Sequence, residues 1–90
     1  MYRIDFTEQA IEDLSKLKRR EPIAFKKART LLLELEKHPQ TGTGQIEQLR
    51  HCKEDTFSRR LDKKHRLVYR IYEESIKVLV LSSFGHYEDK

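Results

Sequence analysis

The chain has 90 residues, of which 37% are hydrophobic and 38% are charged, and its formal net charge is +4. Domains usually contain about 50 to 250 residues, so we expect residues 1–90 to form a single domain. The single cysteine, Cys52, excludes an internal disulfide, and we expect a free thiol there. The longest apolar stretch, Val78–Leu81, is too short to cross a bilayer, so we expect a cytoplasmic protein with no membrane partner.

Positive charge is concentrated in one part of the sequence. Residues 50–70 contain eight basic and three acidic residues, a net charge of +5, whereas the rest of the chain has a net charge of −1. Such a concentration is typical of a surface that binds a polyanion, although an ordinary solvated face gives similar runs of charge. The candidates for contacts to phosphate groups of such a polyanion are Arg50, Arg59, Arg60, Lys63 and Lys64.

The first half of the chain predicts a short strand and two helices. The strand is expected over Tyr2–Phe6, and Thr7 is a good N-cap for the first helix. Glu21-Pro22 interrupts that helix, and Pro22 suits the first turn of a second helix that ends near His38. The expected apolar stripes are Ala10, Ile11, Leu14 and Leu17 in the first helix and Phe25, Ala28, Leu31, Leu32 and Leu35 in the second.

After a loop over residues 39–44, the pattern predicts strands and hence the fold class. The expected strands are Ile46–Leu49, Phe57–Leu61, His65–Tyr72 and Ile76–Ser83. The last is apolar on both faces, which is typical of a strand inside a sheet. We therefore expect an α+β fold, with two N-terminal helices packed on one face of a small antiparallel sheet in the order β-α-α-β-β-β. The Arg-rich strands should lie on the opposite face or at its rim.

The residue types favour metal-free chemistry. The four histidines are scattered and one cysteine cannot complete a zinc set, so we expect neither a metal nor a cofactor. Gly42-Thr43-Gly44 lacks the strand–helix context of a phosphate-binding loop. A glutamate, several arginines and a histidine remain on the predicted sheet. Cleavage of RNA by attack of the 2′ hydroxyl requires only a base, cations that hold the phosphate and an acid.

The most specific segment is Phe57–Tyr69, with the sequence FSRRLDKKHRLVY. Three features accompany it, namely Gly42-x-Gly44 before Glu47, a long strand after a Glu-Glu-Ser turn, and a terminal His86-Tyr87. With these residues the chain resembles the YoeB/Txe family of toxin–antitoxin toxins, within the RelE/ParE superfamily. The resemblance implies a RelE-like microbial ribonuclease fold. It also implies an mRNA interferase that enters the ribosomal A site, contacts rRNA there, cuts the bound message and inhibits translation.

The resemblance also implies roles for individual residues. Glu47 would be the general base, and Arg66 would hold the scissile phosphate, with Arg60 as a second phosphate contact. His86 would be the general acid, and Tyr87 would stack on or orient the nucleotide. The Arg66 assignment agrees with the planar guanidinium fork, which matches phosphate oxygens and stays charged at any working pH.

Simpler interpretations of the same residues stay open. Glu47 is also consistent with a solvated strand residue, and Arg66 with a partner of Asp62 across the turn. His86 is consistent with an exposed side chain near a chain end, and His65 with a structural role at the turn.

The resemblance further implies partners. These are mRNA and the ribosome, a cognate YefM/Phd-type antitoxin, and either a homodimer or a toxin–antitoxin complex that binds operator DNA through the antitoxin. The alternative functions are a non-catalytic ParE-like gyrase inhibitor and a module that only binds the ribosome.

Overall fold

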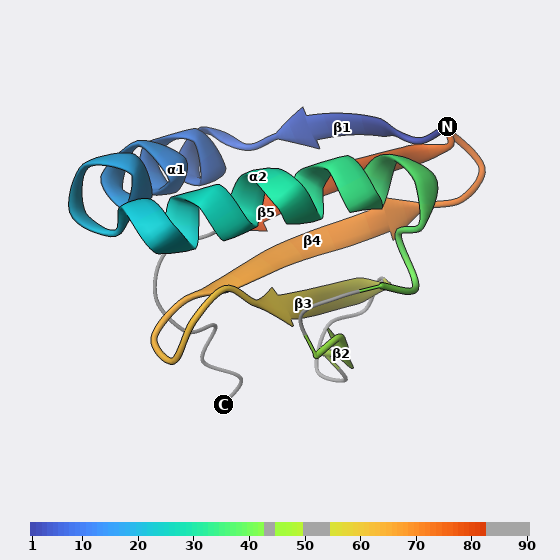
Figure 1. Ribbon diagram of the computed structural model, residues 1–90. Coiled ribbons are helices and arrows are strands. Elements are labelled where there is room, and N and C mark those ends of the chain that lie inside the picture. Colours follow the sequence, from blue (N-terminus) through green and yellow to red (C-terminus); the bar gives the residue numbers. More distant parts are fainter. Residues whose placement is uncertain (43–44, 50–54, 83–90) are drawn as a thin grey trace.

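The computed structural model describes residues 1–42, 45–49 and 55–82, and these form two helices on one face of a five-stranded sheet (Figure 1). The predicted α+β fold class is confirmed. The elements in chain order are β1 (Arg3–Phe6), α1 (Glu8–Arg20), α2 (Pro22–Lys37), β2 (Glu47–Gln48), β3 (Thr56–Arg60), β4 (Arg66–Tyr72) and β5 (Lys77–Ser82). The strand predicted over Ile46–Leu49 is confirmed as β2, which pairs with β3, so the chain has five strands where the expected order β-α-α-β-β-β counts four.

Local capping sets where the helices begin. Thr7 Oγ1 accepts a hydrogen bond from the backbone N–H of Ala10 at 3.0 Å, which confirms Thr7 as the N-cap of α1. Pro22 opens α2, where its missing N–H costs nothing because the first turn has no intrahelical acceptor. Ile11, expected in the apolar stripe, is 59% exposed. It lies about 100° around the helix from the buried Ala10.

The sheet has the strand order β1-β5-β4-β3-β2, and β1 pairs with β5 in parallel. The other neighbouring pairs are antiparallel. The expectation of an antiparallel sheet is therefore wrong at the β1 edge. The chain leaves β1 through α1 and α2, and such a helical crossover allows a later strand to return in the same direction. β5 lies between β1 and β4, which confirms that this apolar strand is inside the sheet.

The core fills the space between the two helices and the inner face of the sheet. Its fully buried members include Leu17, Leu31, Leu35, Leu67, Tyr69, Val78 and Val80. Each such aliphatic side chain stabilises the fold by about 1.5–3 kcal/mol. This packing fixes β3, β4 and β5 against the helices, and it leaves the outer face of the sheet for other roles. Neither helix in the described residues is long and apolar enough to cross a membrane.

Candidate active site

The outer face of the sheet carries arginines from β3 and β4. Side chains alternate between faces along a strand, and Arg59 of β3 points toward the helices, where it contacts Glu34 of α2. The next residue, Arg60, therefore lies on the outer face. The register pairs Arg60 with Arg66 of β4, which places Arg66 and Arg70 on the same face. The expectation that arginines of these strands lie opposite the helices is confirmed for these three residues.

The structure brings together Glu47 and Arg66, two of the residues that the resemblance assigns to catalysis. Arg66 Nη2 lies 3.1 Å from Glu47 Oε1, and the exposed fractions of the two side chains are 10% for Arg66 and 65% for Glu47. Arg66 Nε also donates to Ser58 Oγ at 2.9 Å, and Nη2 donates to the carbonyl oxygen of Gln45 at 2.9 Å. The guanidinium is therefore held firmly, while the carboxylate beside it is open to solvent.

The Asp62 carboxylate closes the turn between β3 and β4. Its Oδ1 accepts hydrogen bonds from the backbone N–H groups of Lys64 and His65, both at 2.8 Å, and these close the turn between β3 and β4. Burial raises the pKa of Asp62, but the two hydrogen bonds and the charges of His65 and Lys64 outweigh it, so the pKa is lowered. His65 is 4% exposed at this turn, whereas Lys63 and Lys64 are exposed.

Arg60 and Arg66 occupy directly paired positions on neighbouring strands. Like charges at such positions repel each other and weaken the strand pairing. Glu47 offsets the charge of Arg66. Arg60 is exposed beside this ion pair. An anion bound between the two guanidinium groups would relieve the repulsion, and a phosphate suits them because its oxygens match their N–H groups.

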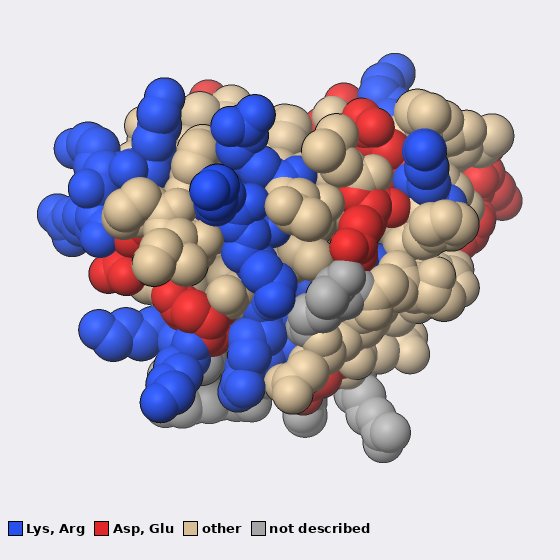
Figure 2. Space-filling view, viewed as in Figure 1, with Lys and Arg blue, Asp and Glu red and all other residues tan. Residues whose placement is uncertain are grey.

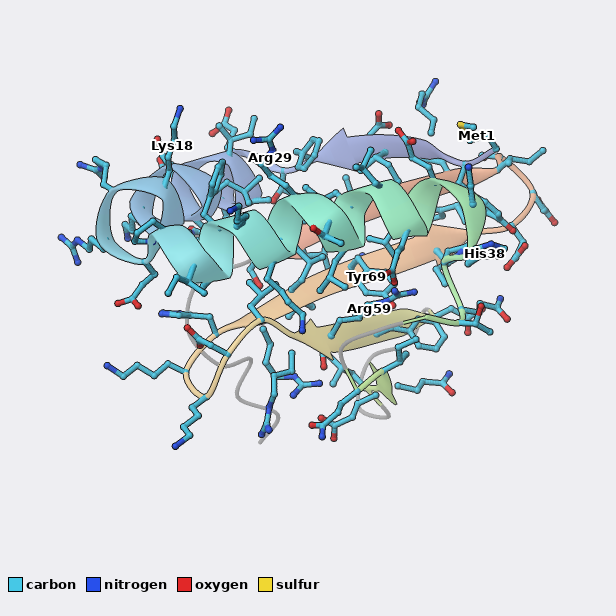
Figure 3. The ribbon with its side chains drawn as sticks, viewed as in Figure 1. Met1, Lys18, Arg29, His38, Arg59 and Tyr69 are labelled. Carbon is cyan, nitrogen blue, oxygen red and sulfur yellow. The ribbon has the colours of Figure 1, made fainter. Side chains whose placement is uncertain are left out.

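Arg59, a candidate for phosphate contact, lies in the core instead, and this prediction is corrected. Its side chain is fully buried, with Nε donating to Tyr69 Oη at 2.9 Å and Nη1 to Glu34 Oε1 at 3.0 Å. Nη2 donates to the carbonyl oxygens of His38 at 2.8 Å and Thr41 at 2.7 Å. Figure 3 shows Arg59 and Tyr69 close together between α2 and the sheet. Burial raises the pKa of Tyr69, an effect that Arg59 opposes, and the net pKa is raised, so the phenol stays neutral.

A second concentration of positive charge lies where α1 meets α2, and the charge count along the sequence missed it. Residues 16–29 contain seven basic residues and one acidic residue, a net charge of +6. Acidic residues elsewhere outside residues 50–70 balance this charge, so the sum outside that segment is −1. We call this region the basic corner. Its exposed basic residues are Lys18, Arg19, Arg20, Lys26 and Arg29. Figure 2 shows Lys and Arg side chains gathered over this end of the molecule and continuing toward the turn between β3 and β4.

One group of side chains has the residue types of a metal site. Glu21, Asp62 and His65 have possible ligand atoms within 4.8 Å of one another, and they join the α1–α2 junction to the β3–β4 turn. The scattered histidines and the single cysteine indicated no metal site in the sequence, and this grouping of two carboxylates with one histidine becomes evident only in the fold. Asp62 Oδ1 already accepts two backbone hydrogen bonds, and Lys63 and Lys64 follow it in the same turn. The turn and the helix junction thus approach each other at this group, and metal independence stays a prediction.

Three of the candidate site residues, Arg50, His86 and Tyr87, lie outside the described residues, as does Cys52. The structure thus places the candidate base Glu47, the candidate phosphate-holding residue Arg66 and Arg60 on one face. The candidate acid and the candidate stacking residue stay predictions from the resemblance.

Comparisons with known proteins give a consistent family. A family model described as YoeB-like toxin of bacterial type II toxin-antitoxin system matches residues 6–87. No curated protein matches. The YoeB/ParE toxin from Agrobacterium tumefaciens is similar in fold, with a TM-score of 0.83 and 24% identity over 94% of this chain and 99% of that chain.

Two structures from Staphylococcus aureus share more sequence with this chain. A YoeB dimer has a TM-score of 0.80 and 28% identity over 96% of this chain and 98% of that chain. A YoeB–YefM complex has a TM-score of 0.76 and 28% identity over 97% of this chain and 99% of that chain.

Proposed function

Because the chain belongs to the YoeB-like toxins of bacterial type II toxin–antitoxin systems, we propose that it is a metal-independent endoribonuclease that cuts mRNA in the ribosomal A site and so inhibits translation. The main support is the contact between Glu47 and Arg66, in which a solvent-accessible carboxylate lies 3.1 Å from a nearly buried guanidinium. A base and a fixed cation this close suit attack of a 2′ hydroxyl on the adjacent phosphate.

In the proposed reaction, Glu47 removes the proton of the 2′ hydroxyl. The 2′ oxygen forms a bond to phosphorus while the bond from phosphorus to the 5′ oxygen breaks, which leaves a cyclic phosphate. Negative charge therefore moves from Glu47 to the phosphoryl oxygens. Arg66 is thus paired with the negative charge of Glu47 before the reaction and with that of the phosphoryl oxygens during it. Its attraction for the substrate is therefore strongest in the transition state.

The remaining roles come from the resemblance. His86 would protonate the departing 5′ oxygen, and Tyr87 would stack on or orient the nucleotide. Arg60 would give a second phosphate contact, which agrees with its exposed position opposite Arg66 in the strand register.

We assign ribosomal docking to the exposed basic side chains outside the catalytic pair. Lys63 and Lys64 extend from the β3–β4 turn, and the basic corner adds further exposed lysines and arginines. Arg50 stays in this proposed set through its place in the basic segment of the sequence. Several phosphate contacts made together favour rRNA, because each one releases counterions.

A cytoplasmic nuclease of this kind needs a partner that neutralises it. The Staphylococcus aureus YoeB structures show that toxin as a dimer and in complex with YefM. The similarity over nearly the whole chain supports a YefM/Phd-type antitoxin as the partner here, and it supports self-association as a dimer. Binding of the toxin–antitoxin complex to operator DNA through the antitoxin is proposed from the resemblance.

The test maps mRNA 5′ ends by primer extension in a translating extract that contains the purified protein. The wild type should give new in-frame ends, and Glu47→Gln should give none, because an amide keeps the shape of the side chain but cannot take the proton. Glu74→Gln, an exposed change in the β4–β5 turn, is the matched control and should cut as the wild type does.

Unchanged ends with Glu47→Gln would show that Glu47 is not the base. If the wild type gives no new ends and leaves translation unaffected, the ParE-like gyrase inhibitor becomes the better proposal. Ribosome binding that slows translation without cleavage would favour the binding module.

A further inference from the structure

Two groups outside the assigned catalytic set hold the Arg66 guanidinium. The hydroxyl of Ser58 accepts from Nε at 2.9 Å, and the main-chain carbonyl of Gln45 accepts from Nη2 at 2.9 Å. Ser58 is 1% exposed and Arg66 is 9% exposed, so the contact between them is shielded from solvent. We propose that Ser58, together with the backbone of Gln45, positions Arg66 for RNA cleavage. This inference rests on the proposed function.

The strand register explains why Ser58 can do this. Ser58 on β3 is paired with Glu47 of β2 on one side and with Val68 of β4 on the other. Arg66 lies two residues before Val68 on the same face, so its side chain reaches Ser58 diagonally across the strands. The side chain of Ser58 thus lies between the candidate base and the candidate phosphate-holding group. Removal of its hydroxyl would leave a shielded N–H group of Arg66 without its acceptor.

The backbone of Gln45 adds a second fixed point. Its φ of +48° lies in the left-handed region, which residues other than glycine rarely adopt. Such conformations persist where surrounding contacts hold them, and they are concentrated at functional sites. Here the carbonyl of Gln45 bonds to Arg66, and Gln45 lies two residues before Glu47. The segment that carries the base is therefore tied to the residue that holds the phosphate.

These contacts determine which part of the guanidinium can meet a substrate. Nε donates to Ser58 and Nη2 donates to Gln45, while Glu47 Oε1 lies 3.1 Å from Nη2 as an ion-pair partner. Within the described residues, no hydrogen bond from Nη1 is observed. When Glu47 takes the proton, its carboxyl loses the charge that attracts Nη2. The outer N–H groups of Nη1 and Nη2 can then form the fork that binds two phosphate oxygens.

A matched pair of residues on β3 makes the inference testable. Thr56 is fully buried on the same face, and its Oγ1 accepts from Arg70 Nε at 3.2 Å, just as Ser58 accepts from Arg66. Thr56→Val removes a buried hydroxyl next to an arginine that has no assigned role in cleavage. Ser58→Ala removes the corresponding hydroxyl next to Arg66.

The experiment measures single-turnover cleavage of mRNA on programmed ribosomes over a range of toxin concentrations. Ser58→Ala should lower the maximal rate by about tenfold to a hundredfold, because small misplacements of a catalytic group have effects of that size. The half-saturating concentration should stay within about twofold, since docking uses other side chains. Ser58→Thr should restore most of the rate, Thr56→Val should keep it, and Arg66→Ala gives the full effect for comparison.

A second measurement reports on Arg66 without relying on cleavage. Exchange of the Arg66 Nε–H with solvent, followed by NMR, should be slow in the wild type and in Thr56→Val and fast in Ser58→Ala. A Ser58→Ala protein that cuts at the wild-type rate, or that cuts no more slowly than Thr56→Val, would overturn the inference while the proposed function stands. A wild type that cuts nothing would overturn both.

Discussion

Arg59 and Arg60 are adjacent in β3, yet their guanidinium groups lie in opposite environments. Arg60 is exposed on the outer face, whereas Arg59 is fully buried and bonded to Tyr69, Glu34 and two loop carbonyls. Those carbonyls follow the end of α2, so Arg59 fastens the start of the loop that leads to Glu47. Its position is structural, and it supports the site from the other face of the sheet.

The replacement of Arg59 should therefore affect stability. Arg59→Met leaves the Tyr69 hydroxyl, the Glu34 carboxylate and two carbonyls without their shared donor, and it should lower the free energy of unfolding by about 3 kcal/mol. Urea denaturation measures this change. Arg60→Met is the control and should change the free energy by less than about 0.5 kcal/mol. Equal destabilisation in both variants would contradict the buried role of Arg59.

Gly42 belongs to the same packing arrangement. Its φ is +126°, and a Cβ added there would lie 2.5 Å from Glu34 Oε1 and 2.9 Å from Arg59 Nη1. Both atoms belong to the ion pair between Glu34 and the buried Arg59, so they cannot move aside without breaking it. The Gly42-x-Gly44 feature of the sequence is thus explained at its first glycine by close packing.

At the scale of elements, the turn between β4 and β5 contains a strained residue. Ile76 has a φ of +50°, and its N–H donates to the carbonyl oxygen of Glu73 at 3.2 Å to close the turn. A β-branched side chain is unfavourable in this left-handed conformation because Cβ crowds the following carbonyl. Ile76 is also 53% exposed, so it gains little burial in return.

Relief of this strain should stabilise the protein. Ile76→Asn places a residue that tolerates the left-handed region in the turn, and it should raise the free energy of unfolding by about 1 kcal/mol. For a chain of this size the melting temperature should then rise by about 4–8 °C, which calorimetry measures. Ile76→Val keeps the β-branch and should give no such gain. A melting temperature that is the same for the Asn and Val variants would contradict the strain.

At the scale of the whole molecule, exposed basic side chains are concentrated at one end. α2 runs from the basic corner to the other end, where Tyr2 N–H donates to the Glu36 carbonyl oxygen at 2.7 Å. Figure 3 shows Lys18 at the corner and Met1 at the far end. The β3–β4 turn, with Lys63 and Lys64, lies beside the α1–α2 junction, where polar atoms of Asp62, His65 and Glu21 lie within 4.8 Å of one another. Two segments that are distant in sequence therefore form one positive surface.

Salt should weaken ribosome binding steeply if this surface binds rRNA. Binding measured by filtration or fluorescence at several salt concentrations gives the slope of log affinity against log salt. A triple variant in which glutamine replaces Lys18, Arg19 and Arg20 should reduce that slope by about one for each rRNA phosphate that it no longer binds.

The control neutralises Arg3, Lys37 and Lys77, which lie at the end of the molecule that contains β1 and the end of α2. This variant should bind as the wild type does. A flat salt response, or equal effects of the two triple variants, would show that the binding surface lies elsewhere.

Much of the local structure could be predicted from the sequence because it depends on neighbours in the chain. Thr7 caps α1 through the N–H three residues on, and Pro22 opens α2 for its own steric reasons. The same holds for β4, whose Arg66 and Arg70 share a face through the strand period of two. The Glu47 and Arg66 assignments came from a family pattern, and spacing alone would not have paired them.

The elements, the fold class and the residues that share a strand face thus follow from the sequence alone, because they depend on local periodicity and capping. The parallel pairing of β1 with β5, the burial of Arg59 and the contact of Ser58 with Arg66 became evident only in the folded chain. The β1–β5 pairing depends on which strand lies beside β1 after most of the chain has folded. The burial of Arg59 depends on which face the helices cover, and the Ser58–Arg66 contact depends on the register between strands. No local pattern specifies the covered face or the register.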